Sequence, residues 1–461
     1  MISIANSRIA ACSKAPGGSG KRQLADGLSG IQISHLQYPC GAQSCHPEPK
    51  AKDLAAEWEI RSLRRPDSSL RCAAFRMTSG ARGMAAIHIA LFLCLLPGCR
   101  WDRVRDTHLA QIDGVVAEEI EAGHLPGAVV LVGRGDKVLY HKAFGLEVAE
   151  PFQEAMQKDT IFDMASLTKP IATATAVMIL VDRGKIDVND YVSEYLPAFA
   201  CNGKEQVRIR HLLTHTSGLP AYTDANDLRT RFGESCPDKV IETICGLKAQ
   251  SPPGEEFRYS CLGYITLARV VKTVTGQDID EFSRANIFKP LGMKHTRFNP
   301  PASWQERIAA TEIVNGKLLR GTVHDPLGRL MDGTSGNAGL FSTASDLSIY
   351  CRMLLNRGVW KGKRILSPAA VTMLTAAQSH GRAFGFDVSS GYAWVKGPNA
   401  SHNAFCHTGY TGTSLVCDPD TGTYLILLTN SVHPYDKGAS KPIREKLAEI
   451  VFPHRADAGQ L

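Results

Sequence analysis

Hydrophobic positions after about residue 105 recur with the periods of regular secondary structure. Residues 106–122 place apolar side chains on one stripe at helical spacing, which predicts an amphipathic helix. Two apolar runs, 128–132 and 138–144, flank a Gly-Arg-Gly-Asp turn and predict a β-hairpin. Residues 166–182 have a helical pattern with almost no charge in their interior, so this helix should be buried.

The C-terminal part returns to strands. Residues 413–417 and 423–428 read as two strands across an Asp-Pro-Asp-Thr-Gly turn, and 442–452 predict a last amphipathic helix. Between about 185 and 345, helical segments alternate with loops rich in Pro and Gly. The pattern therefore predicts an α/β fold of the α+β kind, with an antiparallel sheet flanked by helices and interrupted by an inserted all-helical region.

The first hundred residues read differently. Residues 1–76 lack hydrophobic periodicity and are interpreted as a non-native or disordered extension, with Met77 or Met84 as the better start. The apolar run before Cys99 is too short to span a bilayer, so 77–99 predict an export signal. Its Leu-Pro-Gly-Cys end resembles a bacterial lipobox, and a lipid on Cys99 would hold the protein at a membrane. The alternative is an ordinary cleaved signal with an incidental cysteine.

Charge and cysteine content exclude some classes of function. The chain has 52 Lys and Arg against 45 Asp and Glu, and residues 1–99 contain 12 of the former and 6 of the latter. The folded part is therefore almost neutral, which argues against nucleic acid as a partner. The thirteen cysteines show neither a CxxC pair nor His/Cys spacing of the metal-binding kind, so no metal or cofactor is expected.

The first candidate motif opens the apolar helix. Ser166 and Lys169 form an S-x-x-K pair, and positions three apart share a helix face, so the amine can reach the hydroxyl. The helix N-terminus directs partial positive charge at the serine. Burial predicts a depressed pKa for Lys169, which would let it act as a base. Alternatively, the serine lies near the N-cap and the lysine snorkels to solvent.

Two further motifs follow. Tyr259 and Cys261 lie in a loop leading into an apolar helix, where a tyrosine could relay a proton to a leaving group or merely pack in the core. His407, Thr408 and Gly409 precede a strand, and a glycine there lets substrate lie along the strand edge.

In this order the three motifs resemble those of the serine β-lactamase and D-Ala-D-Ala carboxypeptidase superfamily, in the branch of class C β-lactamases and related esterases. The resemblance covers about residues 106–453. Three other stretches match family landmarks: Pro126-Gly127-Ala128, 211–219 and 339–347. The sequence from His407 to Ser414, together with Val323-His324-Asp325, looks most like the group typified by penicillin-binding protein 4B. The 211–219 landmark is expected to be structural, so His215 is not expected to be a catalyst.

Two positions depart from the family pattern. Cys261 stands where the family usually has Asn, and a thiol is a weaker hydrogen-bond donor than an amide. His407 stands where β-lactamases have Lys, and a histidine is mostly neutral at pH 7. Both changes argue against efficient β-lactam hydrolysis and leave acyl transfer intact.

The resemblance implies an exported serine hydrolase of the cell envelope that forms an acyl-enzyme without a cofactor. Ser166 is the expected nucleophile, Lys169 with Tyr259 the expected base, and the backbone N–H groups of Ser166 and Tyr410 the expected oxyanion site. His407, Thr408, Gly409, Tyr410 and Cys261 are the expected substrate-binding residues. The substrate would be a peptidoglycan-type peptide, an amide or a small ester. Alternatives are a true β-lactamase and a non-catalytic penicillin-binding or cell-wall-binding protein.

Overall fold

The computed structural model describes residues 108–436 and 440–453. The predicted extension 1–76, the predicted signal 77–99 and the predicted lipid anchor at Cys99 lie outside the described residues.

A six-stranded antiparallel sheet joins the two ends of the described chain, in the order β11-β12-β13-β1-β2-β3. The predicted hairpin forms β1 and β2, and the predicted C-terminal strands form β12 and β13, which pairs with β1. The strands are β1 (Gly127–Arg134), β2 (Lys137–Val148), β3 (Glu154–Ala155), β11 (Phe405–Thr408), β12 (Ser414–Asp418) and β13 (Thr423–Thr429). β1 and β13 are almost wholly buried because helices cover both faces of the sheet.

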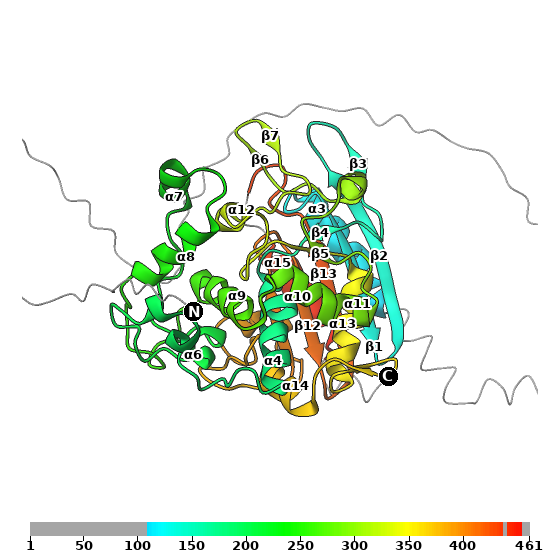
Figure 1. Cartoon of the computed structure of the whole chain (residues 1–461). Coiled ribbons are helices and arrows are strands. Elements are labelled where there is room, and N and C mark those ends of the chain that lie inside the picture. The colour runs from blue at the N-terminus through cyan, green and yellow to red at the C-terminus, as the bar shows by residue number, and fades with distance from the viewer. Residues whose placement is uncertain (1–107, 437–439, 454–461) are drawn as a thin grey trace, which may run out of the picture. The chain divides into compact units, whose positions relative to one another are not determined.

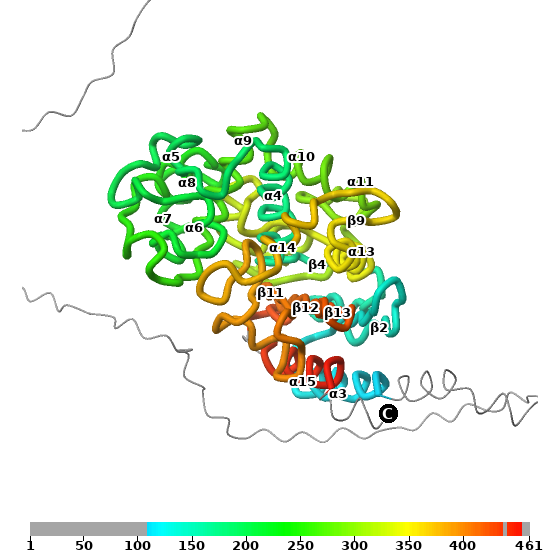
Figure 2. The backbone as a smooth tube through the Cα atoms, turned by 90° about the horizontal axis from the view of Figure 1, so that it is seen from below, coloured from blue at the N-terminus to red at the C-terminus, as the bar shows by residue number. Residues whose placement is uncertain are grey.

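Two helices cover one face of the sheet. They are the predicted first and last amphipathic helices, α3 (Gln111–Glu121) and α15 (Lys441–Val451), and Figure 2 shows them side by side beneath the strands. Their apolar stripes, which include Val116 and Leu447, share a buried cluster with Val130 and Leu427 of the sheet. The sequence prediction is confirmed for both helices.

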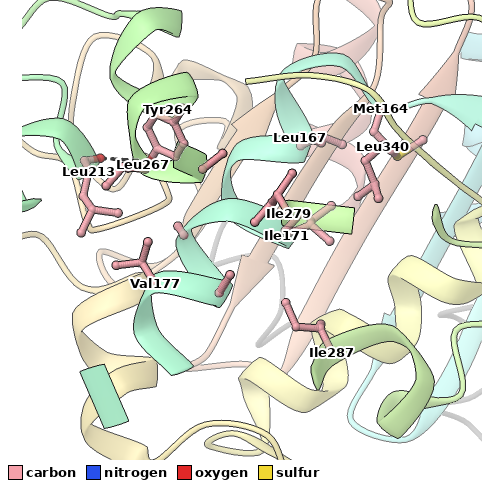
Figure 3. Packing of buried hydrophobic residues seen from close by; sticks show 14 of the residues in the cluster. Met164, Leu167, Ile171, Val177, Leu213, Tyr264, Leu267, Ile279, Ile287 and Leu340 are labelled. Carbon is pink, nitrogen blue, oxygen red and sulfur yellow. Dashed lines mark hydrogen bonds between the residues drawn. The ribbon is translucent and has the colours of Figure 1, made fainter. Parts of the chain in front are cut away.

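On the other face of the sheet, α13 (Ala344–Leu355) packs against β1 and β13, and the apolar helix predicted for 166–182 belongs to the same buried cluster. This helix is irregular, because a 3₁₀ turn η1 (Ala165–Leu167) and a π-helical turn η2 (Lys169–Ala174) precede α4 (Thr175–Asp182). Its length and hydropathy would suit a membrane span, but 83% of it is buried inside the protein. Figure 3 shows its apolar side chains packed among those of neighbouring segments. It is therefore a core helix, as the sequence predicted.

The inserted region is mostly helical, and Figure 1 shows it at one side of the sheet. Its helices are α5 (Val192–Tyr195), η3 (Pro197–Phe199), α6 (Ile209–Leu213), α7 (Ala225–Phe232), α8 (Pro237–Gly246), α9 (Cys261–Thr275), α10 (Ile279–Ser283), η4 (Arg284–Phe288), α11 (Lys289–Leu291), η5 (Ala302–Arg307) and α12 (Pro326–Leu330). It also contains short strands that the sequence did not predict: β5 (Arg297–Phe298), β6 (Ile313–Val314), β7 (Lys317–Leu318) and β8 (Leu340–Ser342). The segments after it are α13 (Ala344–Leu355), β9 (Val359–Trp360), β10 (Lys363–Arg364), α14 (Pro368–Thr375) and η6 (Ala393–Lys396).

One of these short strands positions the start of the apolar helix. β8 pairs with β4 (Phe162–Asp163), directly before the S-x-x-K motif. The N–H of Met164 also donates a hydrogen bond of 2.8 Å to the carbonyl of Leu340. The inserted region therefore fixes the backbone on which Ser166 stands.

Candidate active site

The turn that presents Ser166 is strained and tightly held. Ala165 has a φ of 45°, a left-handed conformation that is unfavourable for a residue with a side chain. The buried carboxylate of Asp163 accepts the N–H of Ala165 at 2.8 Å. Ser166 is half-buried, whereas every other residue from 161 to 180 is buried. The turn therefore brings this one hydroxyl to the surface of an otherwise closed core.

Lys169 is fully buried beneath Ser166. Its Nζ donates hydrogen bonds to Ser166 Oγ at 2.9 Å and to the carbonyl of Asn337 at 3.0 Å. The predicted depression of its pKa is wrong. Burial does act to lower the pKa of Lys169, but the negative forms of Cys261 and Tyr259 and the carboxylate of Asp325 together raise it above its usual value. Lys169 therefore holds its proton most firmly when Cys261 or Tyr259 is in its negative form.

Tyr259 lies directly before α9, as predicted, and is held there by a histidine. The N–H of Ser260 donates to Nδ1 of His215 at 3.0 Å, and the His215 ring stacks on Tyr259 with centroids 4.3 Å apart. Lys169 Nζ lies 5.0 Å from the centroid of the Tyr259 ring. The structure thus brings Ser166, Lys169 and Tyr259 together, and His215 positions the tyrosine.

Cys261 begins α9 and is half-buried, with a free thiol. Its backbone N–H donates to the carbonyl of Ala221 at 2.9 Å. The thiol lies close enough to Lys169 to be the largest charge interaction that raises the pKa of that lysine. Cys261 therefore belongs to the same cluster of side chains, at the position where the sequence comparison expected an asparagine.

The third motif lies on the edge of the sheet beside Ser166. His407 and Thr408 belong to the edge strand β11 itself, whereas the sequence placed them before a strand. The N–H of Gly409 donates to the carbonyl of Thr413 at 2.7 Å, and Thr413 Oγ1 donates to the carbonyl of Met164 at 3.1 Å. A Cβ on Gly409 would lie 2.1 Å from Thr413 Oγ1 and 2.5 Å from the Met164 carbonyl. Glycine is therefore needed where this edge approaches the serine turn.

Two backbone N–H groups in this region have no internal acceptor. Among residues 108–436 and 440–453, neither the N–H of Ser166 nor that of Tyr410 donates a hydrogen bond within the protein. The side chain of Tyr410 points away toward other partners, since its ring stacks on His324 and its hydroxyl donates to Asp436 at 2.6 Å. Two unpaired donors beside a nucleophile have the composition of an oxyanion site.

His407 is buried and neutral. Its Nδ1 lies 2.8 Å from the carbonyl of Thr408, which can only accept, so Nδ1 carries the proton and Nε2 presents a lone pair. Burial, the Arg382 guanidinium and the Lys169 ammonium hold the pKa of His407 well below its usual value. This direction agrees with the expectation of a neutral histidine at this position.

Sequence analysis missed several residues that support the site. Asp163 and Asn337 bind the serine turn and the lysine. The buried Arg444 of α15 donates to the carbonyls of Gly409 at 2.9 Å and Thr413 at 3.1 Å. Asn337 and Arg444 come from distant segments without a motif of their own, and Asp163 lies three residues before Ser166 but outside the S-x-x-K motif, so no local pattern identified them. In the part of the chain that the structure describes, no three His, Cys, Asp or Glu side chains cluster as a metal site requires.

Comparison with known proteins agrees with this geometry. The family model described as Beta-lactamase matches residues 112–449. An N-acetylmuramyl-L-alanine amidase of Bacillus subtilis strain 168 is 32% identical over 359 residues, which cover 70% of this chain and 81% of that protein. A protein of Escherichia coli O157:H7 that bears the provisional name D-alanyl-D-alanine carboxypeptidase is 31% identical over 362 residues, covering 70% of this chain and 82% of its own length.

A solved structure has the same architecture. EstCE1, described as a hydrolase with promiscuous acyltransferase activity, superposes with a TM-score of 0.62 and 25% identity. The match covers 76% of this chain and all of that chain. The predicted β-lactamase-like fold is thus confirmed, with relatives named as an amidase, a carboxypeptidase and a hydrolase with acyltransferase activity.

Proposed function

Because this chain belongs to the β-lactamase family of serine hydrolases, we propose that it cleaves a peptide, amide or ester bond through an acyl-enzyme on Ser166. The observation that carries the proposal is the 2.9 Å hydrogen bond from the buried Lys169 to the one half-exposed side chain in residues 161–180. A nucleophile within hydrogen-bond reach of its base is the arrangement that covalent catalysis requires.

Lys169 and Tyr259 act together as the base. The proton of Ser166 passes to the pair formed by Lys169 and Tyr259, whose amine lies 5.0 Å from the centroid of the tyrosine ring. The serine oxygen attacks the carbonyl, and the N–H groups of Ser166 and Tyr410 bind the resulting oxyanion. Tyr259 then gives its proton to the leaving group. In the second half of the reaction, water gives a proton to Tyr259 as it attacks the acyl-serine, and that proton returns to Ser166 Oγ as the acid leaves.

The substrates we favour are D-Ala-terminated peptides of the peptidoglycan type or small esters, met by an exported enzyme in the cell envelope. The names of the Bacillus and Escherichia relatives support the peptide or amide, and the acyltransferase activity named for EstCE1 supports an acyl donor such as a small ester. A β-lactamase is the less favoured alternative, because the neutral His407 offers no charge to the carboxylate of the antibiotic. A non-catalytic binding protein has no need of the Ser166–Lys169 bond.

The test combines covalent labelling with a substrate comparison on one preparation. A fluorophosphonate should label the protein, and peptide mapping should place the label on Ser166. We expect kcat/KM for a p-nitrophenyl ester and for a D-Ala-D-Ala peptide to exceed that for a chromogenic cephalosporin. Absence of both labelling and turnover would refute the proposal, and a tenfold advantage for the cephalosporin would identify a β-lactamase.

A further inference from the structure

A second buried cation lies close to Tyr259. Arg382 is 0% exposed, and its guanidinium carbon is 5.9 Å from the centroid of the Tyr259 ring and 6.0 Å from that of Phe257. Its Nη1 forms an ion pair of 2.5 Å with Asp387, which is also buried. A side chain of this kind is costly to bury, so its place beside the reacting tyrosine calls for an explanation.

The ion pair leaves most of the hydrogen-bonding capacity of the Arg382 guanidinium unused. None of the three guanidinium nitrogens of Arg382 has a well-directed hydrogen bond within the described residues. The same holds for Nε2 of His215 and Nε2 of His407, which lie around the same tyrosine. A guanidinium that served only to bind Asp387 would be expected to form the two parallel hydrogen bonds of an ideal Arg–carboxylate pair.

Few of the groups around Tyr259 carry charge at neutral pH. The titratable and charged side chains around it are Lys169, His215, Cys261, Tyr264, Arg382, Tyr392 and His407. Burial and the nearby cations hold the pKa values of His215 and His407 well below their usual range, so both rings are neutral. Lys169 and Arg382 are therefore the cations that act on Tyr259, with Asp387 partly offsetting the arginine.

We propose that Arg382 is a positioning residue for Tyr259, and that the buried positive charge of Arg382 favours the oxyanion form of the phenol, which is the form that can take the proton of Ser166. The inference rests on the proposed acyl-enzyme function. Charges separated by about 6 Å in a water-poor interior interact far more strongly than they do in solvent. His407 contributes no charge from the sheet edge, so Arg382 supplies the second cation, with its guanidinium carbon 5.9 Å from the centroid of the ring.

The sign of the electrostatic effect separates this role from a purely structural one. The acid limb of the pH profile of kcat/KM reports ionisation of the base in the free enzyme. Asp387→Asn leaves the guanidinium uncompensated, so the acid limb should move to lower pH. Arg382→Gln leaves the Asp387 carboxylate uncompensated. The acid limb should then move to higher pH by about one unit, which is a tenfold change in the ionisation equilibrium. The neutral pair Arg382→Gln/Asp387→Asn should give a smaller upward shift of about half a unit.

The experiment measures kcat/KM for a neutral p-nitrophenyl ester on the full chain, from pH 5 to pH 9. Arg382→Lys keeps the charge and should leave the limb in place. The matched control is Arg320→Gln/Glu147→Gln, which removes another buried ion pair, of 3.0 Å, outside the group of side chains around Tyr259. The control should keep the native profile even if it lowers stability.

The outcomes are decisive in both directions. Opposite shifts for Asp387→Asn and for the neutral pair support the proposal, and the neutral pair serves if Arg382→Gln fails to fold. An unshifted limb in folded, active variants, or shifts of the same sign, would overturn it. Failure of the proposed function would look different, since the native protein itself would then show neither turnover nor labelling of Ser166.

Discussion

Ser166 and Lys169 meet through a single turn of one helix, whereas the sheet side of the candidate site is assembled from distant segments. On the helix side, a spacing of three residues is enough to form the 2.9 Å contact. On the sheet side, Gly409 depends on Thr413 and on Arg444 of the last helix to stay beside the serine turn. The helix side thus provides the reacting atoms, and the sheet side provides the strand edge beside which the substrate would bind.

The two sides also differ in how they treat charge. The helix side keeps an ammonium buried, because the groups around Lys169 raise its pKa. The sheet side keeps a histidine neutral, because burial and two cations lower the pKa of His407. The lesson is that a residue's type does not fix its charge, since each site selects the ionisation state that its neighbours stabilise.

Loss of the nucleophile should have the largest effect. Ser166→Ala removes the attacking oxygen and should lower kcat by roughly 10⁴-fold or more, with loss of fluorophosphonate labelling. Ser401→Ala is the control, because it removes a buried hydroxyl that donates to Asp418 at 2.6 Å in another part of the fold. Native turnover in the Ser166 variant would show that Ser166 is not the nucleophile.

A side chain added at Gly409 should cause the second-largest loss of activity, because it displaces the edge strand of the sheet side. The Cβ of Gly409→Ala would contact the Met164 carbonyl and push the edge strand from the serine turn, so kcat/KM should fall by roughly 10²-fold, as when an oxyanion donor is lost. Gly114→Ala is the matched control, since nothing lies within 4 Å of the added atom. Steady-state kinetics with circular dichroism would separate lost activity from lost fold, and equal activity of both variants would contradict the geometry.

Restoring a cation on the sheet side should change selectivity. His407→Lys should raise penicillin acylation relative to ester hydrolysis by about tenfold, because a charge-assisted bond to a carboxylate is worth roughly 1.5–3 kcal/mol. The nearby Arg382 will oppose a second cation, which limits the gain. The measurement is acylation rate by stopped flow for both substrates. An unchanged ratio would mean that the antibiotic carboxylate is held elsewhere.

The smallest effect concerns stability against acid. His407 is neutral when folded and has a pKa below 6.5, so the unfolded chain binds more protons as pH falls. The free energy of unfolding should therefore decrease below pH 6.5, by about 1 kcal/mol per pH unit for this one group. His407→Gln should flatten that dependence in urea titrations at pH 5.5 and pH 7.5. An identical pH dependence in both proteins would show that His407 is charged when folded.

Local patterns determined the parts of the protein that depend on neighbours in sequence. The first and last helices, the hairpin, the buried helix and the S-x-x-K contact all follow from periodicity or spacing, and the structure confirms them. The export signal and the lipid anchor at Cys99 stay predictions. The edge strand containing His407 was missed because four residues between loops give too short a period to read.

Only the tertiary structure decided the electrostatics of the site. Sequence reasoning gave Lys169 a low pKa from burial alone, because it could not place Cys261, Tyr259 and Asp325 around the amine. It also had no reason to select Arg382, which lies 123 positions after Tyr259 in the sequence yet 5.9 Å from its ring. Periodicity records which face of a segment is buried, whereas the charge of a buried group depends on what the rest of the chain brings against it.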